Sequence, residues 1–176
     1  SMDTGLIHIY CGDGKGKTTA AVGLAIRCAG RGGTIIFTQF LKSRTTGELA
    51  VLQNVPTLTV LRGKGLEKFT FQMTDEEKAA CKAAQETLFE KAAALIYHTK
   101  PDMAVFDEVI GACHLGMIDE KTVLQFLRHK PNKTEIVMTG RNPSQALLEQ
   151  ADYVSEIVKR KHPFDRGIGA RIGIES

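Results

Sequence analysis

The chain has 176 residues, 43% of them hydrophobic and 24% charged, with a formal net charge of +3 at pH 7. This length predicts one domain (1–176) with a proper core, and the composition is ordinary for a folded globular protein, so a disordered chain is not expected. The small net charge gives no reason to expect binding to nucleic acid or to a membrane surface. No apolar run approaches the ~20 residues that a transmembrane helix needs.

The N-terminus and the cysteines indicate an expected location. Ser1 and Met2 resemble a cloning remnant with the native start at Met2, and no signal peptide is expected because the first strand begins almost at once. The cysteines are widely spaced, with no Cys-x-x-Cys pair and no histidines at ligand spacing. We expect them to be reduced and mostly buried, in a cytoplasmic protein without a structural metal. They are Cys11, Cys28, Cys81 and Cys113.

The first elements form the pattern of a phosphate-binding loop. Residues 6–10 are an apolar run typical of a buried strand, and small apolar residues after a glycine-rich loop predict a helix over 17–28. Strand, glycine loop, Gly-Lys-Thr and helix make the context of a P-loop, whose backbone N–H groups surround phosphate oxygens. Lys17 would reach the outer phosphates, and the Thr18 hydroxyl would bind Mg²⁺.

This loop is one residue shorter than the usual P-loop. The usual pattern has glycine where this chain has Cys11, and counting from Gly12 leaves three residues before Gly16. The alternative is a glycine-rich turn that binds nothing, but Lys17 and the threonines after it favour the P-loop. The expected nucleotide-binding residues are Gly12, Asp13, Gly14, Lys15, Gly16, Lys17, Thr18 and Thr19.

The middle of the chain continues the alternation. A second strand is expected over 34–41, then a polar loop over 42–48, a short helix over 48–52 and a third strand over 57–61. An irregular stretch over 62–72 contains Phe69 and Phe71, whose pattern alone favours packing into the core. Thr74 and Glu77 form a capping box for a helix that stops before Pro101. Its expected apolar face consists of Ala80, Ala84, Leu88, Ala92 and Leu95.

A core strand over 102–108 ends in Asp107 and Glu108. In a Walker B element one such carboxylate holds Mg²⁺ opposite Thr18, directly or through water, and the sequence does not choose between the two. Glu108 could also orient a water in an ATPase. The alternative without a function is that Asp107 and Glu108 form a solvated acidic pair.

The last third adds two strands and two helices. Asp119 is expected to cap a helix that ends by residue 131, a strand over 134–141 ends at Arg141, and Pro143 opens a short helix to residue 150. A final strand is expected over 153–158, and 159–176 is an unassigned C-terminal tail. The basic run over 159–162 is either a solvated surface or an anion-binding segment.

Strands alternating with helices predict an α/β fold, a three-layer αβα P-loop NTPase-like (RecA-like) domain with a mainly parallel sheet. The loops at Gly12 and Ser43, the Asp107-Glu108 pair and Arg141 each follow a strand. They should therefore meet at the carboxyl edge of the sheet, where open parallel sheets bind ligands.

Together these motifs resemble the ATP:corrinoid adenosyltransferases of the CobA/CobO/BtuR type. The family's shortened P-loop reads Gly-Asn-Gly-Lys-Gly-Lys-Thr-Thr, close to residues 12–19 here. The resemblance runs in order from about Gly5 to the C-terminus, and it is more specific than the P-loop alone. Its segments are 12–21, 39–42, 105–108, 139–141, 161–165 and 173–175.

The resemblance implies transfer of the 5′-deoxyadenosyl group of ATP to the Co(I) of a reduced corrinoid, with release of triphosphate. It implies catalytic roles for Lys15, Lys17 and Thr18, an ATP contact for Arg141, and Mg²⁺ at Thr18, Asp107 and Glu108. ATP would lie reversed relative to ordinary ATPases. The resemblance further implies a homodimer and a flavoprotein reductase as electron donor.

The family also places a Phe-Thr-Trp segment beneath the corrin to displace its lower axial ligand. Phe69-Thr70-Phe71 resembles that segment, with Phe71 where Trp is expected, so the resemblance assigns Phe69 and Phe71 to corrinoid binding. A further departure is that the chain begins almost at the first strand, whereas family members often carry an N-terminal helical segment over the corrinoid. A lower corrinoid affinity or a more open site is therefore expected.

Two other functions remain open at this stage. One is a P-loop ATPase or kinase acting at the γ-phosphate, and the other is a nucleotide-dependent corrinoid carrier without chemistry. The products differ: triphosphate for the transferase, ADP or phosphate for the ATPase or kinase, and no turnover for the carrier.

Overall fold

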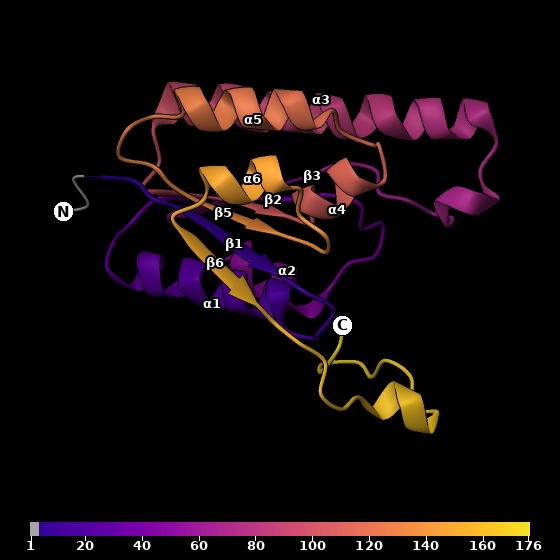
Figure 1. Cartoon of the computed structure of the whole chain (residues 1–176). Helices are drawn as coiled ribbons and strands as arrows, with labels where there is room; N and C mark the ends of the chain where they lie inside the picture. Colours follow the sequence, from indigo (N-terminus) through magenta and orange to yellow (C-terminus); the bar gives the residue numbers. More distant parts are fainter. Residues whose placement is uncertain (1–3) are drawn as a thin grey trace.

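The structure is a computed structural model that describes residues 4–176. Six strands form one sheet in the order β3-β2-β4-β5-β1-β6, and every neighbouring pair is parallel. Helices cover both faces of this sheet (Figure 1). The predicted three-layer α/β, P-loop NTPase-like fold is therefore confirmed. The strands are β1 (Ile7–Cys11), β2 (Ile35–Gln39), β3 (Leu58–Arg62), β4 (Met103–Asp107), β5 (Glu135–Thr139) and β6 (Tyr153–Glu156).

The helices divide between the two faces. One face carries α1 (Lys17–Gly30) and α2 (Gly47–Leu52). The other carries α3 (Asp75–Thr99), α4 (Val109–His114), α5 (Glu120–His129) and α6 (Gln145–Gln150). Short 3₁₀ turns, η1 (Thr70–Gln72) and η2 (Pro163–Arg166), lie before α3 and in the C-terminal tail.

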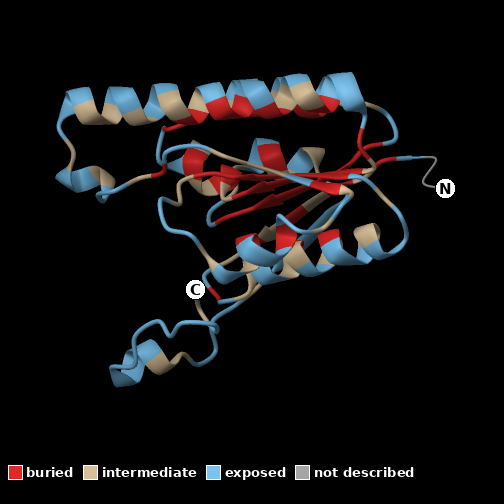
Figure 2. Cartoon of the chain, turned by 180° about the vertical axis from the view of Figure 1, so that it is seen from behind, coloured by how far each residue is buried: buried red, intermediate tan, exposed pale blue. Residues whose placement is uncertain are grey.

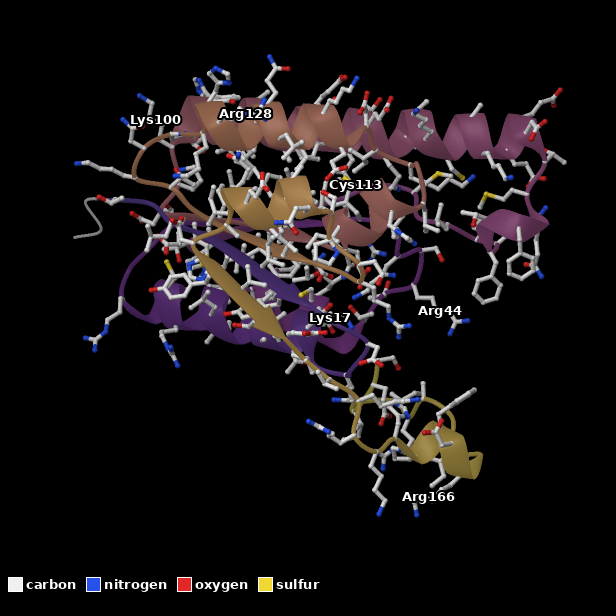
Figure 3. All side chains as sticks on the ribbon, in the orientation of Figure 1. Lys17, Arg44, Lys100, Cys113, Arg128 and Arg166 are labelled. Atoms are coloured by element: carbon white, nitrogen blue, oxygen red, sulfur yellow. The ribbon has the colours of Figure 1, made fainter. Side chains whose placement is uncertain are left out.

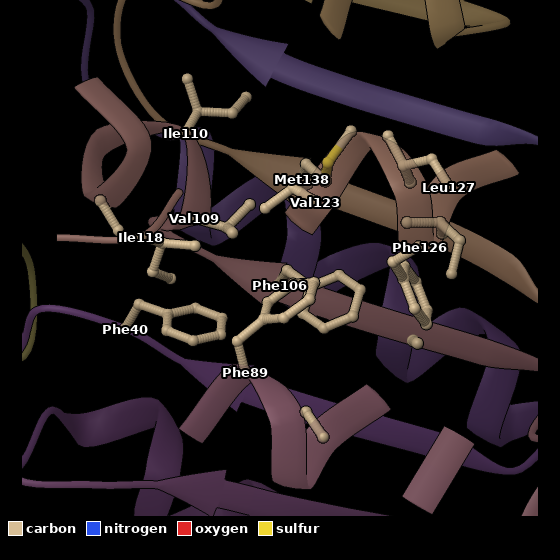
Figure 4. Close-up of a cluster of buried hydrophobic side chains, with 14 of the residues drawn as sticks. Phe40, Phe89, Phe106, Val109, Ile110, Ile118, Val123, Phe126, Leu127 and Met138 are labelled. Carbon is tan, nitrogen blue, oxygen red and sulfur yellow. The ribbon is translucent and has the colours of Figure 1, made fainter. Parts of the chain in front are cut away.

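The central strands are apolar on both faces because both faces are covered. On β4, Phe106 packs in the cluster under α3 and α5, whereas Val105 packs against α1. Figure 4 shows the first cluster, in which the ring centroids of Phe89 and Phe106 lie 5.3 Å apart and those of Phe106 and Phe126 lie 5.4 Å apart. Figure 2 shows that the buried residues follow the strands and the inner faces of the helices.

Helix α3 begins and ends where predicted, but its buried face is rotated. The Thr74–Glu77 capping box is present, and Lys100 ends the helix with φ 46°. Ala80 is exposed and Ala84 is only partly buried, because the first turns of α3 extend beyond the sheet (Figure 2). Leu95, near the other end of α3, is also only partly buried. The residues that α3 buries are Gln85, Leu88, Phe89, Ala92 and Ile96.

Several local predictions are wrong in detail. Helix α4 was not predicted, because Glu108 before it adopts φ 65° and makes no side-chain cap. Helix α6 is opened by Ser144, whose hydroxyl accepts from Leu147 N at 3.2 Å, and not by Pro143. Strand β6 ends at Glu156, and its four residues are exposed at the sheet edge. Of the four free cysteines only Cys11 is buried.

Candidate functional site

The predicted P-loop, residues 12–16, lies between β1 and α1 and is hydrogen-bonded to the chain after β6. Gly12 and Gly16 have φ values of 108° and 117°, which favour glycine. A Cβ atom on Gly12 would collide with the carbonyl oxygen of Ile157. The same carbonyl accepts a hydrogen bond from Gly14 N at 2.8 Å. The close approach of these two segments therefore explains why glycine occupies this turn.

Lys17 is the first residue of α1, and its side chain turns back toward the preceding loop. Its Nζ donates to the carbonyl oxygen of Gly14 at 2.9 Å. Burial lowers the pKa of Lys17, and the nearby charge of Arg141 lowers it further. Lys15 and Thr19 are exposed at the same end of the loop. A cation that has lost part of its water shell interacts strongly with an incoming anion.

Asp107 stands at the centre of a network that joins three strand ends to the P-loop. Its side chain is 0% exposed. Thr18 Oγ1 and Thr139 Oγ1 each donate to Asp107 Oδ1 at 2.8 Å. Lys42 Nζ lies 3.2 Å from Asp107 Oδ2 and 3.3 Å from Thr18 Oγ1. The carboxyl ends of β2, β4 and β5 thus converge on the first turn of α1.

Glu108 is oriented differently from its neighbour. Its backbone N–H donates to Thr139 Oγ1 at 2.8 Å, and its side chain lines the pocket above the P-loop. Burial, and then the charge of Asp107, raise the pKa of Glu108, while the charges of Lys42 and Lys17 offset part of this rise. Asp107 is therefore occupied by protein donors, whereas Glu108 faces the space where a ligand would bind.

A pocket of about 420 Å³ adjoins these groups. Its walls come from the P-loop, from the start of α2 and from the end of the C-terminal tail, which returns to the P-loop. Figure 3 shows Lys17 at this end of the sheet, with Arg44 on the neighbouring loop. The lining residues are Lys15, Gly16, Lys17, Thr18, Thr19, Val22, Lys42, Thr46, Gly47, Glu48, Glu108 and residues 173–176.

The oxygen ligands in this pocket suit a magnesium ion. Thr18 supplies a hydroxyl and Glu108 a carboxylate at the pocket wall, and the buried Asp107 carboxylate lies directly behind Thr18. Hard oxygen donors of this kind are the ones that Mg²⁺ prefers. Within residues 4–176 no group of three or more His, Cys, Asp or Glu side chains is placed to hold a metal. An ion here would therefore share its coordination between protein, water and phosphate, as in other nucleotide sites.

Phe69 and Phe71 are not core residues, so the core interpretation is wrong. Their side chains are 70% and 80% exposed. Their rings are stacked on each other, with centroids 5.5 Å apart and an interplanar angle of 7°. They do not line the P-loop pocket. Two large rings stacked in water form an apolar surface that a flat ligand could cover.

The loop before these rings is tied to the nucleotide side of the site. Leu66 N donates to the carbonyl oxygen of Leu41 at 2.8 Å, and Arg62 donates to the carbonyl oxygen of Lys42 at 3.3 Å. Lys42 therefore contacts Asp107 through its side chain, while its backbone accepts from Arg62 at the end of β3 and pairs with Leu66 in the loop before the two rings. Sequence reasoning placed the loop over 42–48 at this edge of the sheet, but it gave no role in the site to Lys42, Thr139 or residues 173–176. For Lys42, its position directly after a buried strand was the available signal.

Two other predicted groups lie outside the pocket lining. Arg141 is exposed at the end of β5, although its charge influences the pKa of Lys17 and of Asp13. The basic run over 159–162 is mostly exposed. Its first residue, Lys159, donates a backbone hydrogen bond to Asp13 at 3.0 Å and pairs with Asp165 at 3.5 Å. Asp13 thus ties the P-loop to the tail.

A second hollow, of about 490 Å³, lies at the opposite edge of the sheet. It is lined by the amino-terminal ends of the strands, including His8, Asp102 and Glu135, and by Arg27 of α1. It contains no residue of the predicted P-loop and no member of the Asp107 network. In the described part of the chain, no helix is long and apolar enough to cross a membrane.

Comparison with known proteins places this geometry in a family. The family model described as ATP:corrinoid adenosyltransferase BtuR/CobO/CobP matches residues 3–176. The chain belongs to this family. It is 36% identical to a corrinoid adenosyltransferase of Sinorhizobium sp., over 98% of this chain and 81% of the relative. It is 32% identical to the Escherichia coli K12 corrinoid adenosyltransferase, over 98% and 86% respectively.

A third relative, the corrinoid adenosyltransferase CobA of Salmonella typhimurium, is 31% identical over 98% of this chain and 86% of its own length. The motifs by which the sequence resembles this adenosyltransferase family are largely those that the fold brings together. Segments 12–21, 39–42, 105–108 and 139–141 all meet around Asp107. Residues 173–175 line the pocket, whereas 161–165 lie apart in the tail.

Proposed function

We propose that this protein transfers the 5′-deoxyadenosyl group of ATP to the cobalt of a reduced corrinoid. The Co(I) electron pair attacks the ribose C5′ and forms the Co–C bond. The C5′–O bond breaks, and triphosphate leaves with the two electrons of that C5′–O bond. The observation that carries the proposal is a complete P-loop network beside a loop that presents two stacked exposed rings. Membership in the corrinoid adenosyltransferase family supports it.

The protein residues would act on the triphosphate. Lys15, Lys17 and the amide groups of residues 12–16 would bind the phosphate oxygens and stabilise the charge on the leaving triphosphate. Thr18 and Glu108 would hold Mg²⁺, with Asp107 fixing Thr18 from below; this ion would supply charge neutralisation at the phosphates. Arg141 would add positive charge at the same edge. No proton leaves C5′, so no general base is assigned.

Phe69 and Phe71 would form the corrinoid surface. Their exposure and stacking support this role, because rings in a core would not be available to a substrate. We also propose, from the resemblance, that the protein is a cytoplasmic homodimer supplied with electrons by a flavoprotein reductase. A single domain over 1–176 is likewise part of the proposal.

One observation favours the alternative of an ATPase. Glu108 lines the pocket and its pKa is raised, as suits a group that positions a water near the γ-phosphate. The two functions release different products, so a product analysis separates them.

The test combines the protein, Mg-ATP and chemically prereduced cob(I)alamin without oxygen. The expected result is a light-sensitive alkyl-cobalt spectrum with one triphosphate per corrinoid alkylated. Lys17→Ala should lower this turnover at least ~10²-fold through lost charge stabilisation, whereas Lys64→Ala, an exposed lysine outside the pocket, should leave it unchanged. ADP and phosphate with an unaltered corrinoid would replace the transferase by the ATPase. No turnover with tight binding would favour the carrier.

A further inference from the structure

Two polar side chains near the pocket have no hydrogen-bond partner among the residues that the structure describes. Gln39, the last residue of β2, is 2% exposed, and both Oε1 and Nε2 of its amide are buried and unpaired. The hydroxyl of Thr46 is also buried and unpaired. Buried polar groups in folded proteins are nearly always hydrogen-bonded, to protein, water or ligand. These atoms are therefore expected to be paired when the site is filled.

The sheet register places Gln39 beside Asp107. The two residues are direct partners in the parallel pairing of β2 and β4. Side chains alternate between the faces of a strand, and Phe37 and Val105, two residues earlier, both pack against α1. Gln39 and Asp107 therefore project toward the same face. That face carries the first turn of α1, where Thr18 donates to Asp107.

Thr46 stands across the pocket at the start of α2. Its φ and ψ of −103° and 155° are those of a helix N-cap, yet its hydroxyl makes no cap hydrogen bond. Thr74 and Ser144, at the same position of α3 and α6, both cap their helices. Thr46 instead lines the pocket together with Thr18 and Lys42. Its hydroxyl is thus available to a ligand in that pocket.

We infer that Gln39 and Thr46 are positioning residues for magnesium-bound water in the nucleotide site. Mg²⁺ in such sites keeps several waters, and each water needs a hydrogen-bond acceptor around it. Among the described residues, the side-chain carbonyl oxygen of Gln39, at the end of β2, and the hydroxyl of Thr46, the N-cap of α2, are buried acceptors without a protein partner. The inference rests on one part of the proposed function, namely that the pocket binds a nucleoside triphosphate together with Mg²⁺.

This role has a specific consequence for binding. Loss of either acceptor should weaken Mg-ATP but leave metal-free ATP almost unchanged, because metal-free phosphates would still bind Lys17 and the loop amides. Outer-shell partners of this kind typically change metal affinity 10- to 100-fold. A purely structural role would instead weaken both forms of the nucleotide equally.

The experiment measures the Kd of ATP by calorimetry, without corrinoid, in Mg²⁺ and again in EDTA. Gln39→Met and Thr46→Val should raise the Kd of Mg-ATP about tenfold or more. Thr46→Ser, which keeps the hydroxyl, should restore binding to near the wild-type value. The matched control is Thr38→Val, whose hydroxyl is also buried and unpaired but lies on the α3 face of β2 with Ile36 and Phe40.

The outcomes separate this inference from the proposed function. An unchanged Kd of Mg-ATP in Gln39→Met and Thr46→Val, with normal wild-type binding, would overturn the inference alone. So would an equal loss in Mg²⁺ and in EDTA, or an equal loss in Thr38→Val. Should Gln39→Met fail to fold, the comparison of Thr46→Val with Thr46→Ser decides. Absence of Mg-ATP binding by the wild type would overturn both the inference and the proposed function.

Discussion

The side-chain amide of Gln85 accepts a hydrogen bond from Leu41 N at 3.0 Å, and its Nε2 donates to the carbonyl oxygen of Lys64 at 3.2 Å. Gln85 lies in α3 and is 1% exposed. It therefore joins the loop after β2, which carries Lys42, to the loop after β3, which leads to the two exposed rings. One buried amide fixes the two halves of the proposed substrate site relative to each other.

Gln85→Leu should lower both the stability and the turnover of the protein. Leucine fills a similar volume but leaves the Leu41 amide and the Lys64 carbonyl without a partner, which costs about 1–3 kcal/mol. We expect a lower urea midpoint and a raised KM for corrinoid. Glu86→Ala, one residue further along α3 in a surface pair with Lys82, is the matched control and should change neither value much. Wild-type stability in Gln85→Leu would contradict the coupling.

Lys42→Met tests whether the ion pair between Lys42 and Asp107 stabilises the fold. Lys42 belongs to the 39–42 motif, but the sequence alone assigned it no role. The Lys42 and Asp107 side chains are 29% and 0% exposed, so the substitution leaves a buried carboxylate with two hydroxyl donors and no cation. We expect a loss on the order of 2 kcal/mol, less than for a fully buried pair because those hydroxyls remain.

The measurement for Lys42→Met is urea unfolding without Mg²⁺, repeated with Mg²⁺ and ATP. Ligands should restore part of the lost stability, because they bind the folded state and a Mg²⁺ ion at Thr18 would place a positive charge near Asp107. Lys68→Met, which breaks the exposed pair with Glu77, serves as the control and should have little effect. An identical response of the two variants would show that Lys42 does not stabilise Asp107.

The sequence predicted the fold and the meeting of the segments after β1, β2, β4 and β5 at one edge of the sheet, because both follow from local patterns. Apolar runs ending in Asp107 or in Arg141 identify parallel strands, and parallel strands place their ends together. The capping box at Thr74 was confirmed for the same local reason. The roles of Lys15, Lys17, Thr18 and the other site residues stay predictions.

What could not be predicted depends on contacts between distant segments. The buried position of Gln85 on α3 contradicts its polarity and is explained only by two loops that it binds. The contact of Gly12 with Ile157 joins residues that the sequence separates by most of the chain. The exposure of Phe69 and Phe71 depends on the path of their loop after β3. Hydrophobic periodicity in the sequence does not predict the path of an irregular loop. Helix α4 was missed because its N-cap, Glu108, has an unusual backbone.

Phe71→Ala should affect one starting substrate much more than the other. If the ring lies against the lower face of the corrin and displaces its axial ligand, the loss should be large from cob(II)alamin with a reductant and small from prereduced cob(I)alamin. Because Phe71 is 80% exposed, the substitution should leave the thermal midpoint nearly unchanged. Phe164→Ala, another exposed ring in the tail, is the control. Equal losses on both substrates would reduce Phe71 to a general binding contact.

The thiol of Cys113, in α4, should resist alkylation in the folded protein. The partial burial of Cys113, and then the negative charges of Glu120 and Asp119, raise the pKa of its thiol from 9.0 to about 12. At pH 8.5 its reactive thiolate should therefore be roughly 10³-fold scarcer than in the unfolded chain. Mass spectrometry of the iodoacetamide-treated peptide measures this, with the protein in urea as the control.

The same shift in the pKa of Cys113 predicts a pH dependence of stability. The folded pKa lies above the unfolded value, so the folded state binds more protons between pH 9.0 and about 12. The free energy of unfolding should fall as the pH rises through this window, and Cys113→Ala should remove that part of the slope. Urea unfolding of the wild type and of Cys113→Ala between about pH 8.5 and 10 measures the difference between their slopes. The upper limit lies on the order of one unit above the ordinary thiol pKa. Equal slopes, or alkylation of native Cys113 at the rate seen in urea, would mean that the thiol is accessible to water and that α4 does not shield it.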